Sequence, residues 1–157
     1  GIRDRVYFYH LTRQSINEAL VPLLKKCLDN NWRVVVRGTD LKLLEALDET
    51  LWEGPGNEFL PHGLLGGAHD SDQPVLLVPE GQVVPPHDCL ICISNASVTG
   101  EEVSLAKRVC IIFQDDSPSD VEHARNQWKK LLDEGLFAKY WDQSSGSWEL
   151  KAETLPK

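Results

Sequence analysis

The chain has 157 residues, of which 41% are hydrophobic and 25% are charged, and its formal net charge is −8 at pH 7. This length and composition are typical of one globular domain, and the acidic balance argues against tight binding to duplex nucleic acid, which depends on Lys and Arg. No apolar run approaches the roughly 20 residues that cross a bilayer, and no signal-like segment opens the chain, so we expect a cytoplasmic protein without a membrane anchor.

The opening segments predict a strand, a helix and a second strand. Residues 6–9 predict the first strand, and residues 34–36 form an apolar run that suits a strand buried on both faces. Between them, Ser15 and Glu18 have the spacing of a capping box, and apolar residues then recur at helical spacing. Pro22 interrupts that pattern, so we expect either a kinked helix or a helix that begins after Ser15.

A second helix and a long loop follow. Thr39 or Asp40 can cap the helix, whose apolar positions continue to Leu51. Residues 53–74 are rich in Gly, Pro, Asp and Asn, which predicts a long loop. Loops of this length in compact domains tend to be functional.

The second half of the chain continues the alternation of strands and helices. Three apolar runs predict buried strands, over residues 75–78, 89–93 and 109–113. A short helix is expected over residues 101–107. Ser117 and Pro118 predict the start of a long helix that stops near Gly135. Short edge strands are expected over residues 139–141 and 147–150.

This order of elements predicts an α/β fold, a three-layer sandwich around a mostly parallel sheet. We expect a single domain over residues 1–150 and a frayed C-terminal tail over residues 151–157.

In such folds, nucleotides bind outside the carboxyl ends of the strands. The turn expected over residues 10–14 has no glycine that would let the backbone approach a pyrophosphate, and the chain has no Walker A sequence. Candidate acid–base and nucleophilic side chains do follow the predicted strands, namely His10, Asp40, Ser94, Asn95, Asp115 and Asp116. They form no motif with fixed roles, so we interpret them as loop residues and helix caps. A small α/β enzyme with a phosphate or nucleotide site at the strand ends is the alternative.

The cysteines predict neither a metal site nor a disulfide. Each lies in an apolar segment, at Cys27, Cys89, Cys92 and Cys110. Cys89 and Cys92 have C-x-x-C spacing, but residues three apart in a strand point to opposite faces of the sheet. We therefore interpret all four as buried structural thiols.

Four residues around the long loop predict a protein-docking surface, namely Trp52, Phe59, Pro61 and His62. Large apolar side chains in a turn-rich loop are hard to bury in their own core, and such residues often contact a partner. The alternative is that the loop folds back over the sheet, with His62 hydrogen-bonded to backbone.

The last long helix predicts a second contact surface. Its apolar stripe, expected to face the sheet, consists of Val121, Ala124, Trp128, Leu131 and Leu132. Arg125 lies one turn from Val121 and from Trp128, and Lys129 lies beside it. A guanidinium beside an indole can bind a peptide that ends in an apolar residue with a free carboxylate. The alternative is that Arg125 and Lys129 only extend past a core tryptophan into solvent.

Nearly the whole chain resembles the family of the chi subunit of the bacterial DNA polymerase III holoenzyme. The resemblance lies in the aromatic first strand, in Leu47-Asp48-x-x-Leu51-Trp52, in Phe59-x-Pro61-His62, and in Ala124-Arg125-x-x-Trp128-Lys129 with Gly135 beyond it. It implies a Rossmann-like α/β fold with no cofactor, no metal and no catalytic activity.

The resemblance also implies two protein partners. The first is the acidic, Phe-terminated C-terminal tail of single-stranded-DNA-binding protein, which would meet Arg125, Trp128 and Lys129. Val121 stands where a basic residue would be expected, so the acidic stretch of the tail would be held less strongly. The second partner is psi or another clamp-loader subunit, which would meet Trp52, Phe59, Pro61 and His62. The expected function is that of a non-catalytic adaptor between that tail and the replicative polymerase.

Overall fold

The computed structural model describes residues 6–12, 16–39, 41–52, 62–64, 74–81, 87–93, 96–115, 117–134, 138–142 and 149–153. Its strands are β1 Val6–Leu11, β2 Val34–Gly38, β3 His62–Leu64, β4 Val75–Pro79, β5 Cys89–Cys92, β6 Arg108–Gln114, β7 Ala138–Asp142 and β8 Glu149–Glu153. Its helices are α1 Ile16–Asp29, α2 Leu41–Trp52, α3 Gly100–Leu105 and α4 Pro118–Asp133.

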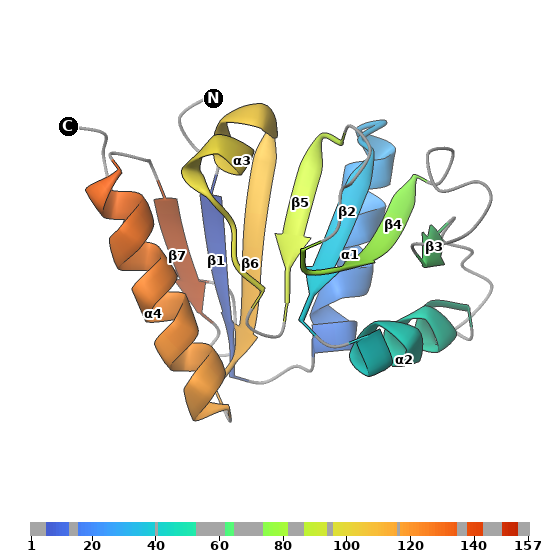
Figure 1. Ribbon diagram of the computed structural model, residues 1–157, viewed down its shortest axis with the longest axis horizontal. Helices are drawn as coiled ribbons and strands as arrows, with labels where there is room; N and C mark the ends of the chain where they lie inside the picture. Colours follow the sequence, from blue (N-terminus) through green and yellow to red (C-terminus); the bar gives the residue numbers. More distant parts are fainter. Residues whose placement is uncertain are drawn as a thin grey trace.

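The strands of the described residues form one eight-stranded sheet with the order β3-β4-β2-β5-β6-β1-β7-β8 (Figure 1). Neighbouring strands are parallel from β3 to β7. The edge strand β8 pairs with β7 in the antiparallel direction. The prediction of an α/β fold with a mostly parallel sheet is therefore confirmed.

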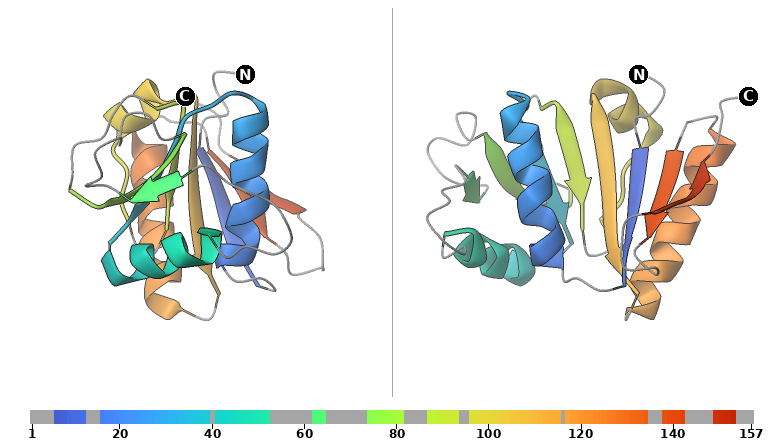
Figure 2. Two further views of the ribbon diagram at one scale, coloured as in Figure 1. Left: turned by 90° about the vertical axis from the view of Figure 1, so that its right-hand side faces the viewer. Right: turned by 180° about the vertical axis from the view of Figure 1, so that it is seen from behind.

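Helices cover both faces of the sheet, so the molecule has three layers (Figure 2). On one face, Leu20 and Leu24 of α1 and Leu44 of α2 pack into a core cluster with alternate strand residues. On the other face, Val103 of α3 and Leu131 of α4 pack with the remaining strand residues. Within the part of the chain that the structure describes, no helix is long and apolar enough to cross a membrane.

The alternation of side chains along the strands separates the two clusters. Cys89 belongs to the cluster under α1, and Cys92 belongs to the cluster under α3 and α4. The prediction that these two thiols point to opposite faces is confirmed. All four cysteines are free and buried.

One predicted boundary was wrong near the first strand. β1 continues to Leu11, so His10 lies in the strand and not in the turn after it. The reason is its long neighbour β6, which keeps His10 paired with Phe113.

Helix α1 begins at Ile16, the residue after Ser15, in agreement with the predicted capping-box position, and Pro22 lies inside the helix. The proline ring is exposed, so the helix accommodates it at the loss of one hydrogen bond.

Two strands extend beyond what periodicity predicted. β3 lies inside the expected loop of residues 53–74, because three residues containing a glycine are too few to give a periodic signal. β8 reaches Glu153, beyond the expected end of the sheet at Leu150, because it pairs with β7.

Candidate functional site

Helix α4 carries the residues of the predicted peptide site. Pro118 occupies its first turn, as predicted, and Ser117 is its N-cap residue. Within the helix, Ala124 is buried against the sheet, Trp128 is half-buried, and Arg125 is exposed beside them. Val121 is half-buried and Lys129 is exposed. The structure thus brings the four predicted residues together along one side of α4.

The predicted core stripe of α4 was wrong at one position. Leu132 has 40% of its surface exposed, whereas Gln127 is only 5% exposed. Gln127 turns toward residues 96–99, where its amide accepts a hydrogen bond from the Val98 N–H (3.3 Å) and donates one to the Val98 carbonyl (3.0 Å). Because Leu132 lies one turn beyond Trp128, it leaves an apolar side chain in solvent on the side of the helix that carries Arg125.

The Trp128 ring is held by two aromatic neighbours from the sheet. The centroid of the Phe8 ring on β1 lies 5.2 Å from that of Trp128, and the centroid of the Tyr140 ring on β7 lies 5.9 Å from it. Both pairs are edge-on, with angles between the ring planes of 71° and 86°. Edge-on pairs of this kind add to the stability that burial provides. The indole therefore has one fixed position while part of its surface stays open to solvent.

Tyr140 connects this aromatic cluster to a hydrogen-bonded histidine. Its hydroxyl lies 2.7 Å from Nδ1 of His10, and Nε2 of His10 lies 2.8 Å from Oδ1 of Asp115. The imidazole also stacks on the Phe113 ring at 4.7 Å and 19°. Sequence analysis placed His10 and Asp115 near strand ends, but it gave Tyr140 no role. Alternation along β7 places Tyr140 on the opposite face from Lys139 and Trp141, but it does not show that Phe8 is the register partner of Tyr140.

Three charged side chains act on the Tyr140 hydroxyl. Burial and the carboxylates of Asp142 and Asp115 raise the pKa of Tyr140 to about 12, while the guanidinium of Arg125 opposes them. Tyr140 is therefore a neutral phenol at physiological pH. Among the described residues Arg125 has no ion-pair partner, so its charge is available to a ligand.

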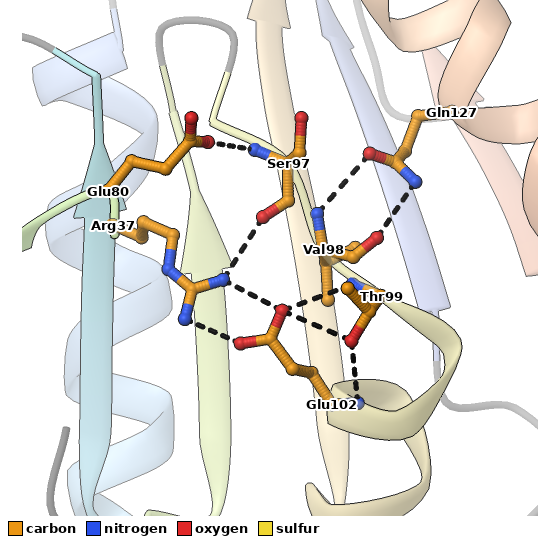
Figure 3. A network of polar contacts seen from close by, with 7 residues as sticks. All are labelled: Arg37, Glu80, Ser97, Val98, Thr99, Glu102 and Gln127. Atoms are coloured by element: carbon orange, nitrogen blue, oxygen red, sulfur yellow. Dashed lines mark hydrogen bonds and ion pairs between the residues drawn. The ribbon is translucent and has the colours of Figure 1, made fainter. Parts of the chain in front are cut away.

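A second polar cluster lies at the carboxyl ends of β2 and β4 (Figure 3). Arg37, which is 7% exposed, makes a bidentate ion pair with Glu102 of α3, at 3.0 and 2.5 Å. Its guanidinium also donates to the Ser97 carbonyl at 3.0 Å, while the Ser97 N–H donates to Glu80 at 2.6 Å.

This cluster fixes residues 96–99 with side chains from four elements. Glu102 completes a capping box with Thr99 and accepts the Thr99 N–H at 3.1 Å. Burial raises the pKa of Glu102, but hydrogen bonds from Arg37 and Thr99 outweigh it and hold that pKa below its usual value. Arg37 and Glu102 are bonded to each other and Glu80 accepts the Ser97 N–H, so we interpret the cluster as structural.

One contact in the structure agrees with the alternative of an enzyme site at the strand ends. His10 and Asp115 are hydrogen-bonded at the strand ends, between β1 and β6, whose following helices cover opposite faces of the sheet. The other candidates lie outside the described residues, namely Asp40, Ser94, Asn95 and Asp116. In the part of the chain that is described, no three His, Cys, Asp or Glu side chains could hold a metal ion.

An apolar cavity of about 230 Å³ lies between α1 and the sheet. Its lining residues are Tyr9, Ala19, Pro22, Leu23, Lys26 and Ile112. None of them is a predicted site residue, and one lysine among apolar groups does not form a phosphate site.

The second predicted surface is described only in part. Trp52 is the last residue of α2 and His62 is the first residue of β3, and these two elements are neighbours at one edge of the sheet (Figure 1). The structure describes the backbone of both residues. Phe59 and Pro61 lie outside the described residues.

The chain is similar to known proteins of the family of DNA polymerase III chi subunits. The family model described as DNA polymerase III chi subunit, HolC, matches residues 4–139. A protein of Rickettsia prowazekii (strain Madrid E) named "Probable DNA polymerase III subunit chi" is 28% identical over 122 residues, which cover 71% of this chain and 74% of that protein. The range matched by the family model contains every residue of both predicted partner surfaces.

Proposed function

The chain belongs to the family of DNA polymerase III chi subunits, and from that premise we propose that α4 binds the acidic C-terminal tail of single-stranded-DNA-binding protein. The protein would act in the cytoplasm as a non-catalytic accessory subunit that links this tail to the clamp loader during DNA replication. The observation that supports this proposal most directly is an exposed Arg125, with no ion-pair partner among the residues that the structure describes, one turn from the half-buried indole of Trp128.

Arg125 would bind the terminal carboxylate of the tail. A guanidinium pairs with a carboxylate through two parallel hydrogen bonds, and such charge-assisted bonds are stronger than neutral ones. The pairing depends on local charge, because the net charge of the protein is −8 and repels an acidic peptide at long range. Lys129, one turn beyond Arg125, would add a second positive charge for the acidic residues of the tail.

The apolar groups beside Arg125 would bind the last side chain of the tail. Trp128 offers the open part of its ring, with Val121 two turns before it and Leu132 one turn after it on the helix. Leu132 is 40% exposed. A phenylalanine side chain placed there would cover it.

A second partner would dock at the edge formed by α2 and β3. We infer that psi or another clamp-loader subunit contacts Trp52, Phe59, Pro61 and His62. The proximity of the α2 and β3 backbones supports a common surface for the first and the last of these residues. A pull-down from lysate with wild type and Phe59→Ala tests it, and equal recovery of clamp-loader subunits by both proteins would count against this surface.

Titration of a fluorescent acidic peptide ending in Pro-Phe tests the tail site. A transient link of this kind typically has micromolar affinity, about −8 kcal/mol. Amidation of the peptide removes the carboxylate and should weaken binding by about 1.5–3 kcal/mol, the range for a hydrogen bond to a charged group. Equal affinity for both peptides would refute the site.

The alternative function, a phosphate or nucleotide site at the strand ends, would use the bonded pair of His10 and Asp115. Saturable binding of ATP or inorganic phosphate that is lost in Asp115→Asn would favour it.

A further inference from the structure

The hydrogen bonds of His10 determine which atom carries each proton. The carboxylate of Asp115 can only accept, so Nε2 of His10 carries the hydrogen of their 2.8 Å bond. In a neutral imidazole the other nitrogen is then an acceptor. Nδ1 must therefore accept the 2.7 Å bond from the hydroxyl of Tyr140. While His10 is neutral, the single hydroxyl proton of Tyr140 is used in this bond, and its oxygen offers only lone pairs to other groups.

Protonation of His10 reverses the bond to Tyr140. An imidazolium donates from both nitrogens, so Nδ1 would donate to the Tyr140 oxygen. The hydroxyl proton of Tyr140 is then free to donate to another acceptor. Tyr140 contacts the indole of Trp128 and lies within electrostatic reach of Arg125. A carboxylate bound by Arg125 would compete for that proton with Asp142 and Asp115, the two carboxylates that act on Tyr140.

We propose that Tyr140 is a further carboxylate-binding residue of the α4 site, and that His10 is a positioning residue whose protonation converts Tyr140 from an acceptor into a donor. The affinity for an acidic peptide then rises as the pH falls. This inference rests on the proposed function, because the ligand that benefits is the carboxylate of the tail.

Three charged side chains lie around the bond between His10 and Tyr140. Asp115, which follows β6, is bonded to Nε2 of His10, and Asp142 is the register partner of His10 on β7. The positive charge of Arg125 on α4 acts on Tyr140. If protonation of His10 strengthens peptide binding, peptide binding favours proton uptake by His10 to the same extent.

Tyr140 and Phe113 keep the same ionisation and position while His10 gains its proton. Tyr140 does not ionise near neutral pH, because burial raises its pKa to about 12. The Phe113 ring stacks on the imidazole at 4.7 Å, which fixes the ring plane in both protonation states. Only the proton on Nδ1 changes.

The test is titration of the same fluorescent peptide between pH 8.0 and pH 5.5 at constant ionic strength, the range over which histidines gain a proton. Wild type should bind about five- to tenfold more tightly at pH 5.5, the effect of one added hydrogen bond. Tyr140→Phe keeps the ring against Trp128 but removes the hydroxyl, so its affinity should not rise between pH 8.0 and pH 5.5. His10→Gln should also lose the gain.

The matched control is His123→Gln, which removes a second half-buried histidine, on α4 itself, bonded to Ser97 and to the Ala96 carbonyl. It should keep the pH response. A response that survives Tyr140→Phe or disappears in His123→Gln would overturn the inference. Nitrogen-detected NMR of wild type gives a further check without a variant, since a hydrogen on Nδ1 of His10 at pH 8.0 would also overturn it.

The outcomes separate the two proposals. Amidation-sensitive binding at pH 8.0 with no pH response would overturn the role of His10 and leave the tail site standing. No binding at any pH would overturn both.

Discussion

The indole of Trp128 meets the ring of Tyr140 edge-on, with the ring centroids 5.9 Å apart and the planes at 86°. This contact joins the last helix to strand β7 and holds the indole half out of the core. Arg125 lies three residues before Trp128 on α4, a spacing that puts the two side chains on the same side of the helix. The proposed peptide site therefore depends on how the sheet positions a tryptophan, and less on the helix by itself.

Removal of the Trp128 side chain should affect both folding and binding. Trp128→Ala should lower the free energy of unfolding by about 2–3 kcal/mol, less than a fully buried aromatic residue, and should abolish measurable peptide binding. Trp128→Tyr keeps an aromatic ring against Phe8 and Tyr140, so it should retain peptide affinity within about threefold, or about 0.6 kcal/mol. Urea denaturation and fluorescence titration of both variants measure the two effects. Unchanged affinity in Trp128→Ala would contradict the site.

Substitution of the polar Gln127 should cost more stability than substitution of the apolar Leu132. Gln127→Leu leaves the buried N–H and carbonyl of Val98 without partners and should cost about 1–3 kcal/mol of stability. Leu132→Gln should change stability by less than about 0.5 kcal/mol, because the side chain is already 40% exposed.

Leu132→Gln also has a binding test. It should weaken the Pro-Phe peptide severalfold, because the apolar rim beside Trp128 is lost. Thermal melts and titrations of the two variants check these results together, and a Leu132→Gln protein that is strongly destabilised would show that the residue belongs to the core.

Gln127 and Leu132 also show which features of α4 can be predicted from the sequence and which cannot. The start of α4 followed from Ser117 and Pro118, and the opposite orientations of Cys89 and Cys92 followed from the period of a strand. The choice between Gln127 and Leu132 depends on where residues 96–99 lie, and those are far from α4 in the chain. Periodicity within one helix contains no information about that neighbour.

The same limit explains the part of the site that sequence analysis missed. Arg125, Trp128 and Lys129 follow from one helix, and they were predicted. Tyr140 and His10 join them only because β1 and β7 pair in register and place both side chains under α4. Pairing between strands more than a hundred residues apart is a tertiary property, and a single sequence gives no signal for it.

Loss of the Glu102 carboxylate should destabilise the fold in a pH-dependent way. The pKa of Glu102 is held below its unfolded value, about 4.3. Its contribution to stability is therefore present above that value and disappears as the pH falls through the lower folded pKa. Glu102→Gln should cost about 2–4 kcal/mol at pH 7, because Arg37 is left buried without a counterion.

Urea denaturation at several pH values measures this effect. The difference between wild type and Glu102→Gln should shrink below about pH 4.3. Glu101→Gln changes the neighbouring, exposed glutamate of α3 and serves as the control, with a change below about 0.5 kcal/mol. A difference that is constant down to pH 3 would contradict the role of the carboxylate.

The four cysteines should be unreactive in the native protein. All of them are buried, and burial raises the pKa of Cys92 to about 12, with the nearby Arg37 only partly opposing it. Since the thiolate is the reactive form, Ellman's reagent at pH 8 should label none of them quickly in native protein and all four in guanidinium chloride. Rapid native labelling would show that one strand opens readily.

The most direct test of the central claim is the titration of the acidic Pro-Phe peptide against wild type, Arg125→Ala and Lys130→Ala. Lys130 is exposed on α4 like Arg125 and carries the same charge, but it lies two residues beyond Trp128 on another side of the helix. We predict that Arg125→Ala weakens the peptide with a free carboxylate by about 1.5–3 kcal/mol and has little further effect on the amidated peptide. Lys130→Ala should weaken both peptides equally and slightly. Equal losses in the two variants, or an Arg125→Ala protein that still distinguishes the free acid from the amide, would contradict the claim that Arg125 beside Trp128 recognises a terminal carboxylate.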